Sequence, residues 1–159
     1  MIDFQKMLSE LSTHGVRFVI VGGVAATVHG SSRLTHDLDI VYARDPENLG
    51  RMVRALASHE PYLRGAPPGL PFRFDEPTLQ AGLNFALTTD LGPMDLLGEI
   101  TGGGRFEDLV DRTVEISLFG LKFSCLDLET LITVKRAAGR PKDLETVAEL
   151  ESIRDTSES

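Results

Sequence analysis

The sequence contains a single cysteine, Cys125, among its 159 residues. A lone cysteine excludes a disulfide within the chain and a zinc site built from cysteines. Its place in the segment Leu121–Leu126 favours a buried thiol with a packing role over a nucleophile. The chemistry of this protein therefore has to come from other residue types.

Long apolar runs are also missing, since none approaches the roughly 20 residues that a helix needs to cross a bilayer. The first residues, Met1–Lys6, lack the basic and then apolar layout of a signal peptide. We therefore expect a cytoplasmic protein without membrane contact. A length of 159 residues and a hydrophobic content of 42% predict one domain over residues 1–159. We expect it to be helical from about residue 127 and to end in a frayed polar tail from about residue 154.

Basic residues are too few to balance the acidic ones, at 16 against 24, and the net charge is −8. This balance argues against broad nucleic-acid binding, which draws on a basic surface, but it leaves room for a local basic patch. Part of the acidic excess could belong to a carboxylate site that a metal neutralises.

Apolar spacing and turn residues predict an α/β protein, with a small mixed sheet, helices on one side and C-terminal helices that line a cleft. The expected helices cover 3–14, 23–29, 46–58, 127–138 and 141–153, with a helical turn near 106–111. The expected strands cover 16–21, 37–42, 83–87, 93–97, 114–118 and 121–123.

The segment 60–77 is different, because prolines and glycines crowd into it. Such a composition excludes a continuous helix or a central strand. A long irregular stretch inside a compact domain is either a functional loop or a mobile excursion, and the sequence does not decide between them.

A glycine pair and a pair of aspartates form the most informative pattern. Gly22-Gly23 ends an apolar strand and opens a short helix, and Asp37-Leu38-Asp39 begins the next predicted strand. Side chains alternate along a strand, so Asp37 and Asp39 point to the same face with Cα atoms roughly 6.5 Å apart. Two carboxylates held so close repel each other unless a cation lies between them. Mg²⁺ favours such oxygen ligands, and a glycine turn at a helix N-terminus suits a phosphate.

The glycine pair, the spacing and the Asp-x-Asp strand together resemble the signature of the DNA polymerase beta superfamily of nucleotidyltransferases. The chain is most similar to small bacterial nucleotidyltransferase-like proteins and to abortive-infection type nucleotidyltransferase toxins. The resemblance covers roughly residues 1–150, but only the first forty are diagnostic. Further residues that carry it are Ala25, His29-Gly30, Arg33, Thr35, Lys135, Arg140, Lys142 and Asp143.

This resemblance implies a third carboxylate on a strand beside the Asp-x-Asp strand, and Asp95 fits that place. Asp95 lies between apolar residues of a predicted strand, where a buried acid needs a partner. It would complete the metal site or accept the proton of an attacking hydroxyl. Asp90 competes for the role but lies beside Gly92-Pro93 and is typical of a turn.

Two basic residues are candidates for binding the phosphates of a nucleotide. Arg33 precedes the acidic strand and is a candidate phosphate contact. Lys135 falls on the apolar face of its predicted helix, in register with Leu128 and Leu131. Its side chain either snorkels to solvent or points its ammonium into the cleft, and the sequence leaves both open.

The function that follows is transfer of a nucleoside monophosphate from a nucleoside triphosphate such as ATP to a hydroxyl acceptor. Two Mg²⁺ or Mn²⁺ ions would be held by Asp37, Asp39 and Asp95, and Gly22 and Gly23 would receive the triphosphate. The acceptor stays open between a small molecule, a protein and an RNA end. The alternative is a non-catalytic protein of this fold that binds nucleotide, a second copy of itself or a cognate partner, as in a toxin–antitoxin pair. A phosphate-binding module without metal is a weaker third hypothesis.

Overall fold

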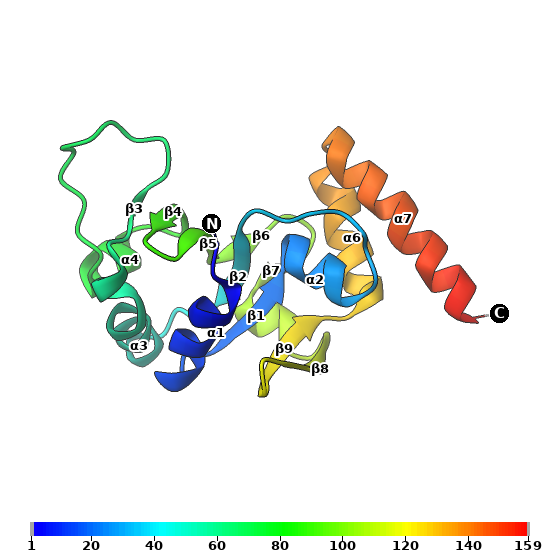
Figure 1. The fold of residues 1–159 in the computed structure, drawn as a ribbon, viewed down its shortest axis with the longest axis horizontal. Coiled ribbons are helices and arrows are strands. Elements are labelled where there is room, and N and C mark those ends of the chain that lie inside the picture. The colour runs from blue at the N-terminus through cyan, green and yellow to red at the C-terminus, as the bar shows by residue number, and fades with distance from the viewer. Residues whose placement is uncertain (1, 159) are drawn as a thin grey trace.

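The computed structural model describes residues 2–158 and is organised around one seven-stranded mixed sheet (Figure 1). The strands lie in the order β3-β4-β5-β2-β1-β9-β8. Their bounds are Phe18–Val21 (β1), Leu38–Tyr42 (β2), Tyr62–Leu63 (β3), Asn84–Thr89 (β4), Gly92–Leu97 (β5), Thr113–Leu118 (β8) and Leu121–Leu126 (β9). A separate ribbon pairs Glu99–Ile100 (β6) with Gly104–Arg105 (β7).

The helices are Phe4–Thr13 (α1), Gly22–Val28 (α2), Pro46–Leu56 (α3), Glu76–Ala81 (α4), Phe106–Leu109 (α5), Leu128–Ala138 (α6) and Pro141–Glu158 (α7), with a 3-10 turn at Ala57–His59 (η1). A mixed sheet combined with helices confirms the predicted α/β class. The helix α4 was not predicted, because six residues are too few to show a helical period. None of the helices within residues 2–158 combines the length and apolar character needed to span a membrane.

The centre of the sheet sets the position of the acidic residues. The strand β2 pairs antiparallel with β1 and parallel with β5. In the second pairing Asp39 lies directly opposite Asp95. The neighbours Leu38, Ile40 and Leu96 are fully buried, so they fix this register through the core. Two aspartates on adjacent strands are thereby held side by side on a rigid support.

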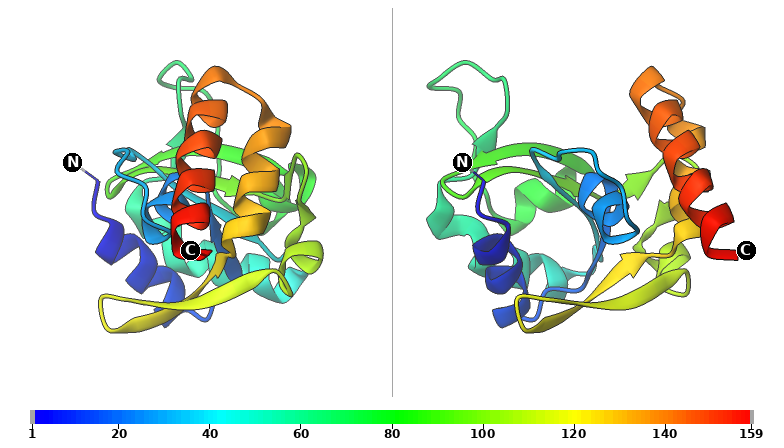
Figure 2. Two further views of the ribbon diagram at one scale, coloured as in Figure 1. Left: turned by 90° about the vertical axis from the view of Figure 1, so that its right-hand side faces the viewer. Right: turned by 45° about the vertical axis from the view of Figure 1, so that its right-hand side comes forward.

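One group of helices, α1, α3 and α4, packs together at the β3 side of the molecule (Figures 1 and 2). Asp3 and Asp45 cap α1 and α3 through their side chains. Asn48 of α3 is fully buried, accepts a hydrogen bond from the Arg17 amide and donates to the carbonyls of Arg17 and Ala43. This one side chain therefore ties α3 to the backbone next to β1 and β2.

A second group, α2, α6 and α7, covers the other end of the sheet, and α6 and α7 form an antiparallel pair (Figure 2). Gly139 ends α6 with a positive φ of 69°, and Pro141 opens α7, as the sequence predicts. The helix α7 continues beyond residue 153, where we expected its end, and runs to Glu158. Ser159 of the predicted tail lies outside the described residues.

Two smaller sequence predictions can be checked in the core and at a glycine turn. Cys125 is fully buried in β9, and burial raises the pKa of its thiol to about 12, which confirms its packing role. The Gly102–Gly104 turn joins β6 to β7 and lies against α6. A Cβ on Gly102 would lie 2.5 Å from that of Ala137. The glycine is needed there for close packing.

Candidate active site

Three carboxylates come together at the centre of the sheet. Asp37 directly precedes β2, Asp39 lies on β2 and Asp95 lies on β5, and each offers an oxygen within 4.8 Å of the others. All three side chains are partly buried. We call these residues the acidic cluster. The structure thus brings together the carboxylates that the sequence predicted, including the one assigned through strand adjacency.

The electrostatics of the acidic cluster favour uptake of a cation or a proton. Burial is the main cause that raises the pKa of Asp39 to about 8, and a hydrogen bond with Asp95 and the charge of Asp37 add to it. Burial also raises the pKa of Asp37, with the charge of Asp95 as the next cause. Within residues 2–158, Asp39 Oδ1 is buried without a hydrogen-bond partner. Such an orphaned carboxylate oxygen in an all-oxygen donor set fits a hard divalent cation.

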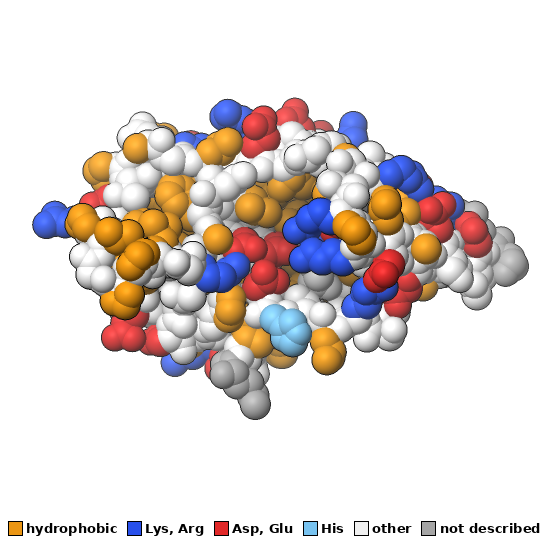
Figure 3. Space-filling view, turned by 90° about the horizontal axis from the view of Figure 1, so that it is seen from above, with side chains coloured by type: hydrophobic (Ala, Val, Ile, Leu, Met, Phe, Trp, Pro, Cys, Tyr) orange, Lys and Arg blue, Asp and Glu red, His pale blue; other side chains and the backbone are white. Residues whose placement is uncertain are grey.

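The acidic cluster lies in a cavity of about 420 Å³ whose walls also carry basic residues. In the space-filling view, acidic side chains lie in a hollow with basic side chains gathered on two sides of it (Figure 3). Besides the acidic cluster, the residues that line this cavity include Gly23, Arg33, His36, Lys135, Arg140, Lys142 and Asp143. A second hollow of about 250 Å³ shares Asp39 and Lys135 with the first and has apolar walls from Leu97, Ile100, Leu131 and Val134.

Gly23 lines the larger cavity, Gly22 lines the second hollow, and both allow close approach of neighbouring parts of the chain. Gly22 has a positive φ of 67°, and a Cβ on it would lie 2.0 Å from Asp39 Oδ2. A Cβ on Gly23 would lie 2.4 Å from Thr35 Oγ1. Both positions therefore require glycine for contacts within the protein, apart from any role toward a phosphate. In the described chain, no side chain caps the N-terminus of α2.

Replacing Gly23 with valine should weaken nucleotide binding about 10- to 100-fold, because Thr35 and the cavity wall must move. Calorimetric titration of the folded variant would measure this loss. A matched pair of variants separates the causes. The pair is Gly23→Ala alone and Gly23→Ala combined with Thr35→Gly, which removes the side chain that the new Cβ would meet. If the clash with Thr35 is the only harm, the combined variant should bind nucleotide normally. Persistent loss in that combination would indicate that the phosphate itself needs the space.

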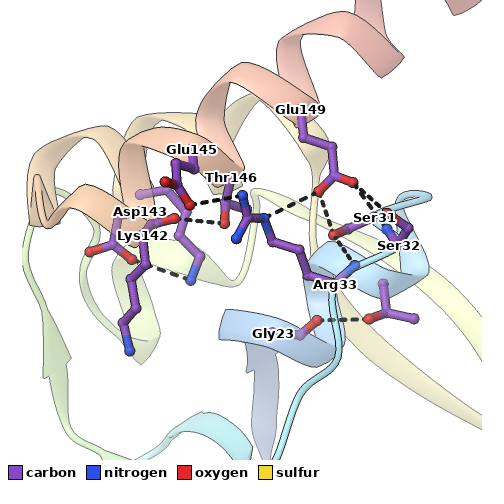
Figure 4. Close-up of polar contacts among 11 residues, drawn as sticks. Gly23, Ser31, Ser32, Arg33, Lys142, Asp143, Glu145, Thr146 and Glu149 are labelled. Carbon is purple, nitrogen blue, oxygen red and sulfur yellow. Dashed lines mark hydrogen bonds and ion pairs between the residues drawn. The ribbon is translucent and has the colours of Figure 1, made fainter.

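Arg33 is held on α7 through carboxylates. Its Nη2 lies 3.1 Å from Glu145 Oε2, and its Nε lies 3.9 Å from Glu149 Oε1. Glu149 also accepts hydrogen bonds from the Ser31 hydroxyl, the Ser32 hydroxyl and the Ser32 amide (Figure 4). The loop that precedes the acidic strand is thereby fastened to α7. Arg33 lines the cavity but would have to leave these carboxylates to meet a phosphate.

Lys135 lines the cavity as well, and its ammonium lies 3.7 Å from Asp143 Oδ1. Asp143 is 1% exposed and also accepts hydrogen bonds from the Arg140 side chain, at 2.6 and 3.1 Å. Burial opposes ionisation of Asp143, but the hydrogen bonds from Arg140 and the charges of Arg140 and Lys135 outweigh it and lower its pKa. A cationic helix junction therefore faces the acidic cluster.

Sequence reasoning missed one cation of the site, Arg64, which follows β3 within the proline-rich segment. Its Nη2 lies 2.9 Å from Asp95 Oδ1, and its Nη1 lies 3.9 Å from Asp37 Oδ2. Neither period nor motif marks this arginine, because only the pairing of β3 with β4 brings it to the site. The competing acid Asp90, in contrast, pairs with His59 Nδ1 at 2.9 Å, away from the cluster, in keeping with a turn role.

No protein-family model matches the sequence, and no curated protein sequence matches it either. Solved structures do match. One is the lincosamide antibiotic adenylyltransferase LnuA with lincomycin bound, at 16% identity and a TM-score of 0.62, covering 96% of this chain and 98% of that one. Another is TM1012 from Thermotoga maritima, a candidate nucleotidyltransferase, at 19% identity and a TM-score of 0.56, covering 96% of both chains. The chain therefore has the nucleotidyltransferase fold, as its signature predicts.

Proposed function

We propose that this protein, which has the nucleotidyltransferase fold, transfers a nucleoside monophosphate from a nucleoside triphosphate to a hydroxyl acceptor. The observation that carries the proposal is the acidic cluster, whose three carboxylates offer oxygens within 4.8 Å of one another inside a cavity rimmed by cations. A fold alone does not establish an activity, since one fold hosts many functions. The arrangement of Asp37, Asp39 and Asp95 supplies the chemical argument.

The donor set fits one or two Mg²⁺ or Mn²⁺ ions, because it consists of carboxylate oxygens and includes the unpartnered Asp39 Oδ1. Bound there, such ions would supply charge stabilisation for the attacking and leaving oxygens at phosphorus. Asp37 and Asp39 would hold the cations. Asp95 would complete the site or accept the hydroxyl proton of the acceptor.

The remaining residues would bind and orient the triphosphate. The acceptor oxygen would attack the α-phosphorus, and the bond to the bridging oxygen would break so that pyrophosphate leaves with that electron pair. Gly22 and Gly23 let the chain pass close to Asp39 and Thr35, and the phosphates would meet their backbone amides there. Lys135 and Arg33 would offset the charge on the departing pyrophosphate. The acidic cluster would repel the triphosphate without such cations.

ATP and a small hydroxylated molecule are the first substrates to test. The structure of LnuA, an adenylyltransferase that carries lincomycin, is covered over 98% of its length by this chain. A chain of this size is therefore compatible with a small acceptor. The net charge of −8 argues in the same direction, because an RNA end would be drawn to a basic surface.

The decisive experiment follows phosphate label from ATP. The α-labelled nucleotide should pass its label to an acceptor in the presence of Mg²⁺, and the γ-labelled nucleotide should release it as pyrophosphate. Titration with a non-hydrolysable ATP analogue, with Mg²⁺ or with EDTA, tests the nucleotide site before the acceptor is known. Absence of metal-dependent nucleotide binding would overturn the proposal, and binding without transfer to any acceptor would favour the non-catalytic alternative.

A further inference from the structure

The proline-rich segment 60–77 contains two arginines, Arg64 and Arg73. Among the described contacts of this segment, only the side chain of Arg64 reaches the centre of the sheet. Its amide donates to the Ala86 carbonyl at 2.9 Å and so extends the pairing of β3 with β4. Its Nη2 donates to the Leu87 carbonyl at 2.8 Å and lies 2.9 Å from Asp95 Oδ1. The guanidinium is therefore positioned from an edge strand against the acidic cluster.

The loop that follows Arg64 is organised by other side chains. The residues that follow Arg64, from Gly65 to Pro71, are mostly exposed and project away from the sheet as a long loop (Figure 1). Tyr62 organises this loop through its hydroxyl, which contacts the Pro67 carbonyl and accepts from the Leu70 amide. None of these loop contacts involves the Arg64 guanidinium, whose partners are the Leu87 carbonyl on β4 and the carboxylates of Asp95 and Asp37.

The oxygen that Arg64 contacts belongs to one of the three carboxylates that could hold a metal. Asp95 Oδ1 is buried, and apart from the ion pair with Arg64 it lacks a hydrogen bond within residues 2–158. Asp37 lies 3.9 Å from the other terminal nitrogen of the same guanidinium. Arg64 thus offsets charge on two of the three carboxylates, whereas Asp39 faces Lys135. The guanidinium and a divalent cation would both bring positive charge to Asp95, so they repel each other and compete for this carboxylate.

We propose that Arg64 is the built-in counter-ion of the acidic cluster and that a divalent cation occupies the cluster only by displacing its guanidinium from Asp95. This inference rests on the proposed function, because it concerns the same metal site. Arg64 then sets how tightly the cluster holds metal and keeps the metal-free carboxylates from repelling one another. Displacement would also remove the hydrogen bond of the guanidinium to the Leu87 carbonyl and so loosen the short β3 edge.

Metal affinity without nucleotide gives the first test. Arg64→Gln should bind Mn²⁺ on the order of tenfold more tightly than the unaltered protein, because a competing positive charge is removed. Arg64→Lys keeps the charge and should bind about as weakly as the unaltered protein. Arg73→Gln is the matched control, since it removes an exposed arginine from the same segment and should leave Mn²⁺ affinity unchanged. Calorimetric titration at one ionic strength measures all four proteins.

Trypsin supplies a second readout that needs no substitution. It cleaves after an arginine whose side chain is accessible, and Gly65 on the far side of the bond is exposed. Saturating Mn²⁺ should speed cleavage after Arg64 at least severalfold, while cleavage after the exposed Arg73 in the same digest should stay constant. A metal-independent rate after Arg64 would overturn displacement even if the variants unfold.

The outcomes separate this inference from the proposed function. Equal or weaker Mn²⁺ binding by folded Arg64→Gln, with clear binding by the unaltered protein, would leave the metal site intact and remove Arg64 as its competitor. Absence of Mn²⁺ binding in both proteins would overturn the metal site together with this inference. Tighter binding in Arg64→Gln with unchanged Arg73→Gln supports displacement.

Discussion

Replacing both Asp37 and Asp39 with asparagine should abolish metal-dependent nucleotide binding and leave the fold intact. Loss of groups that only orient metal ligands already costs about 10- to 100-fold in affinity, so loss of two ligands should cost at least about 100-fold. Asparagine preserves the shape of each side chain and removes the charge. Arg64 keeps Asp95 as its partner in this variant, so no cation is left stranded.

The same variant should be more stable than the unaltered protein when metal is absent and the pH is high. Burial raises the pKa of Asp39 to about 8, above its ordinary value of 3.8. The folded protein therefore holds a proton that the unfolded chain has released, and stability falls as the pH rises from about 4 to about 8. The stability advantage of the variant over the unaltered protein should grow across this interval.

Urea denaturation in EDTA at pH 5 and pH 8.5, together with nucleotide titration in Mg²⁺, would measure both effects. Glu107→Gln combined with Asp111→Asn is a suitable control, because it removes two exposed carboxylates and should change neither quantity much. Nucleotide binding by the double variant that matches the unaltered protein would show that the acidic cluster is not the metal site.

The carboxylates could be predicted from the sequence because short-range rules place them. Alternation along a strand puts Asp37 and Asp39 on one face, and the apolar neighbours of Asp95 mark a strand beside them. The parallel pairing of β2 with β5 then sets Asp39 opposite Asp95. The signature of the superfamily supplied the choice of Asp95, since strand order is not readable from residue periods alone.

Arg33 and Lys135 could be predicted from the sequence as cations of the site, but their partners could not, and neither could Arg64. Arg33 lies 112 positions from Glu145 along the chain, and no local pattern connects them. The strand β3 that delivers Arg64 is only two residues long, too short to show alternation. Such contacts depend on how distant elements pack, and they decide which cation is free to meet a phosphate.

For Lys135, the structure helps to decide between a side chain that extends to solvent and one that points its ammonium into the cavity. Its side chain is 17% exposed, so it does not simply extend into solvent. The ammonium lies 3.7 Å from Asp143, and its charge partly opposes the rise that burial causes in the pKa of Asp39. Lys135 thus lies between a buried carboxylate and the acidic cluster, where a polyphosphate would have to pass. A lysine with only a structural role would interact with Asp143 alone.

Lys135→Met should stay folded and lose about 1.5–3 kcal/mol of triphosphate binding, the scale of a hydrogen bond to a charged group. The fold should persist because Arg140 keeps both of its hydrogen bonds to Asp143, and methionine fills the space of the lysine stem. The loss should be larger for a triphosphate than for a monophosphate, because the ammonium is expected at the distal phosphates. Calorimetric titration of both nucleotides would measure the difference.

Lys122→Met is the matched control, since Lys122 lies on β9 with a side chain that is 72% exposed. It removes the same charge far from the acidic cluster and should leave both affinities unchanged. If Lys135 served only Asp143, Lys135→Met would lower the free energy of unfolding and leave triphosphate affinity as it was. Equal weakening for triphosphate and monophosphate would indicate general attraction of anions instead, and Lys135 would then have no place among the phosphate-binding residues.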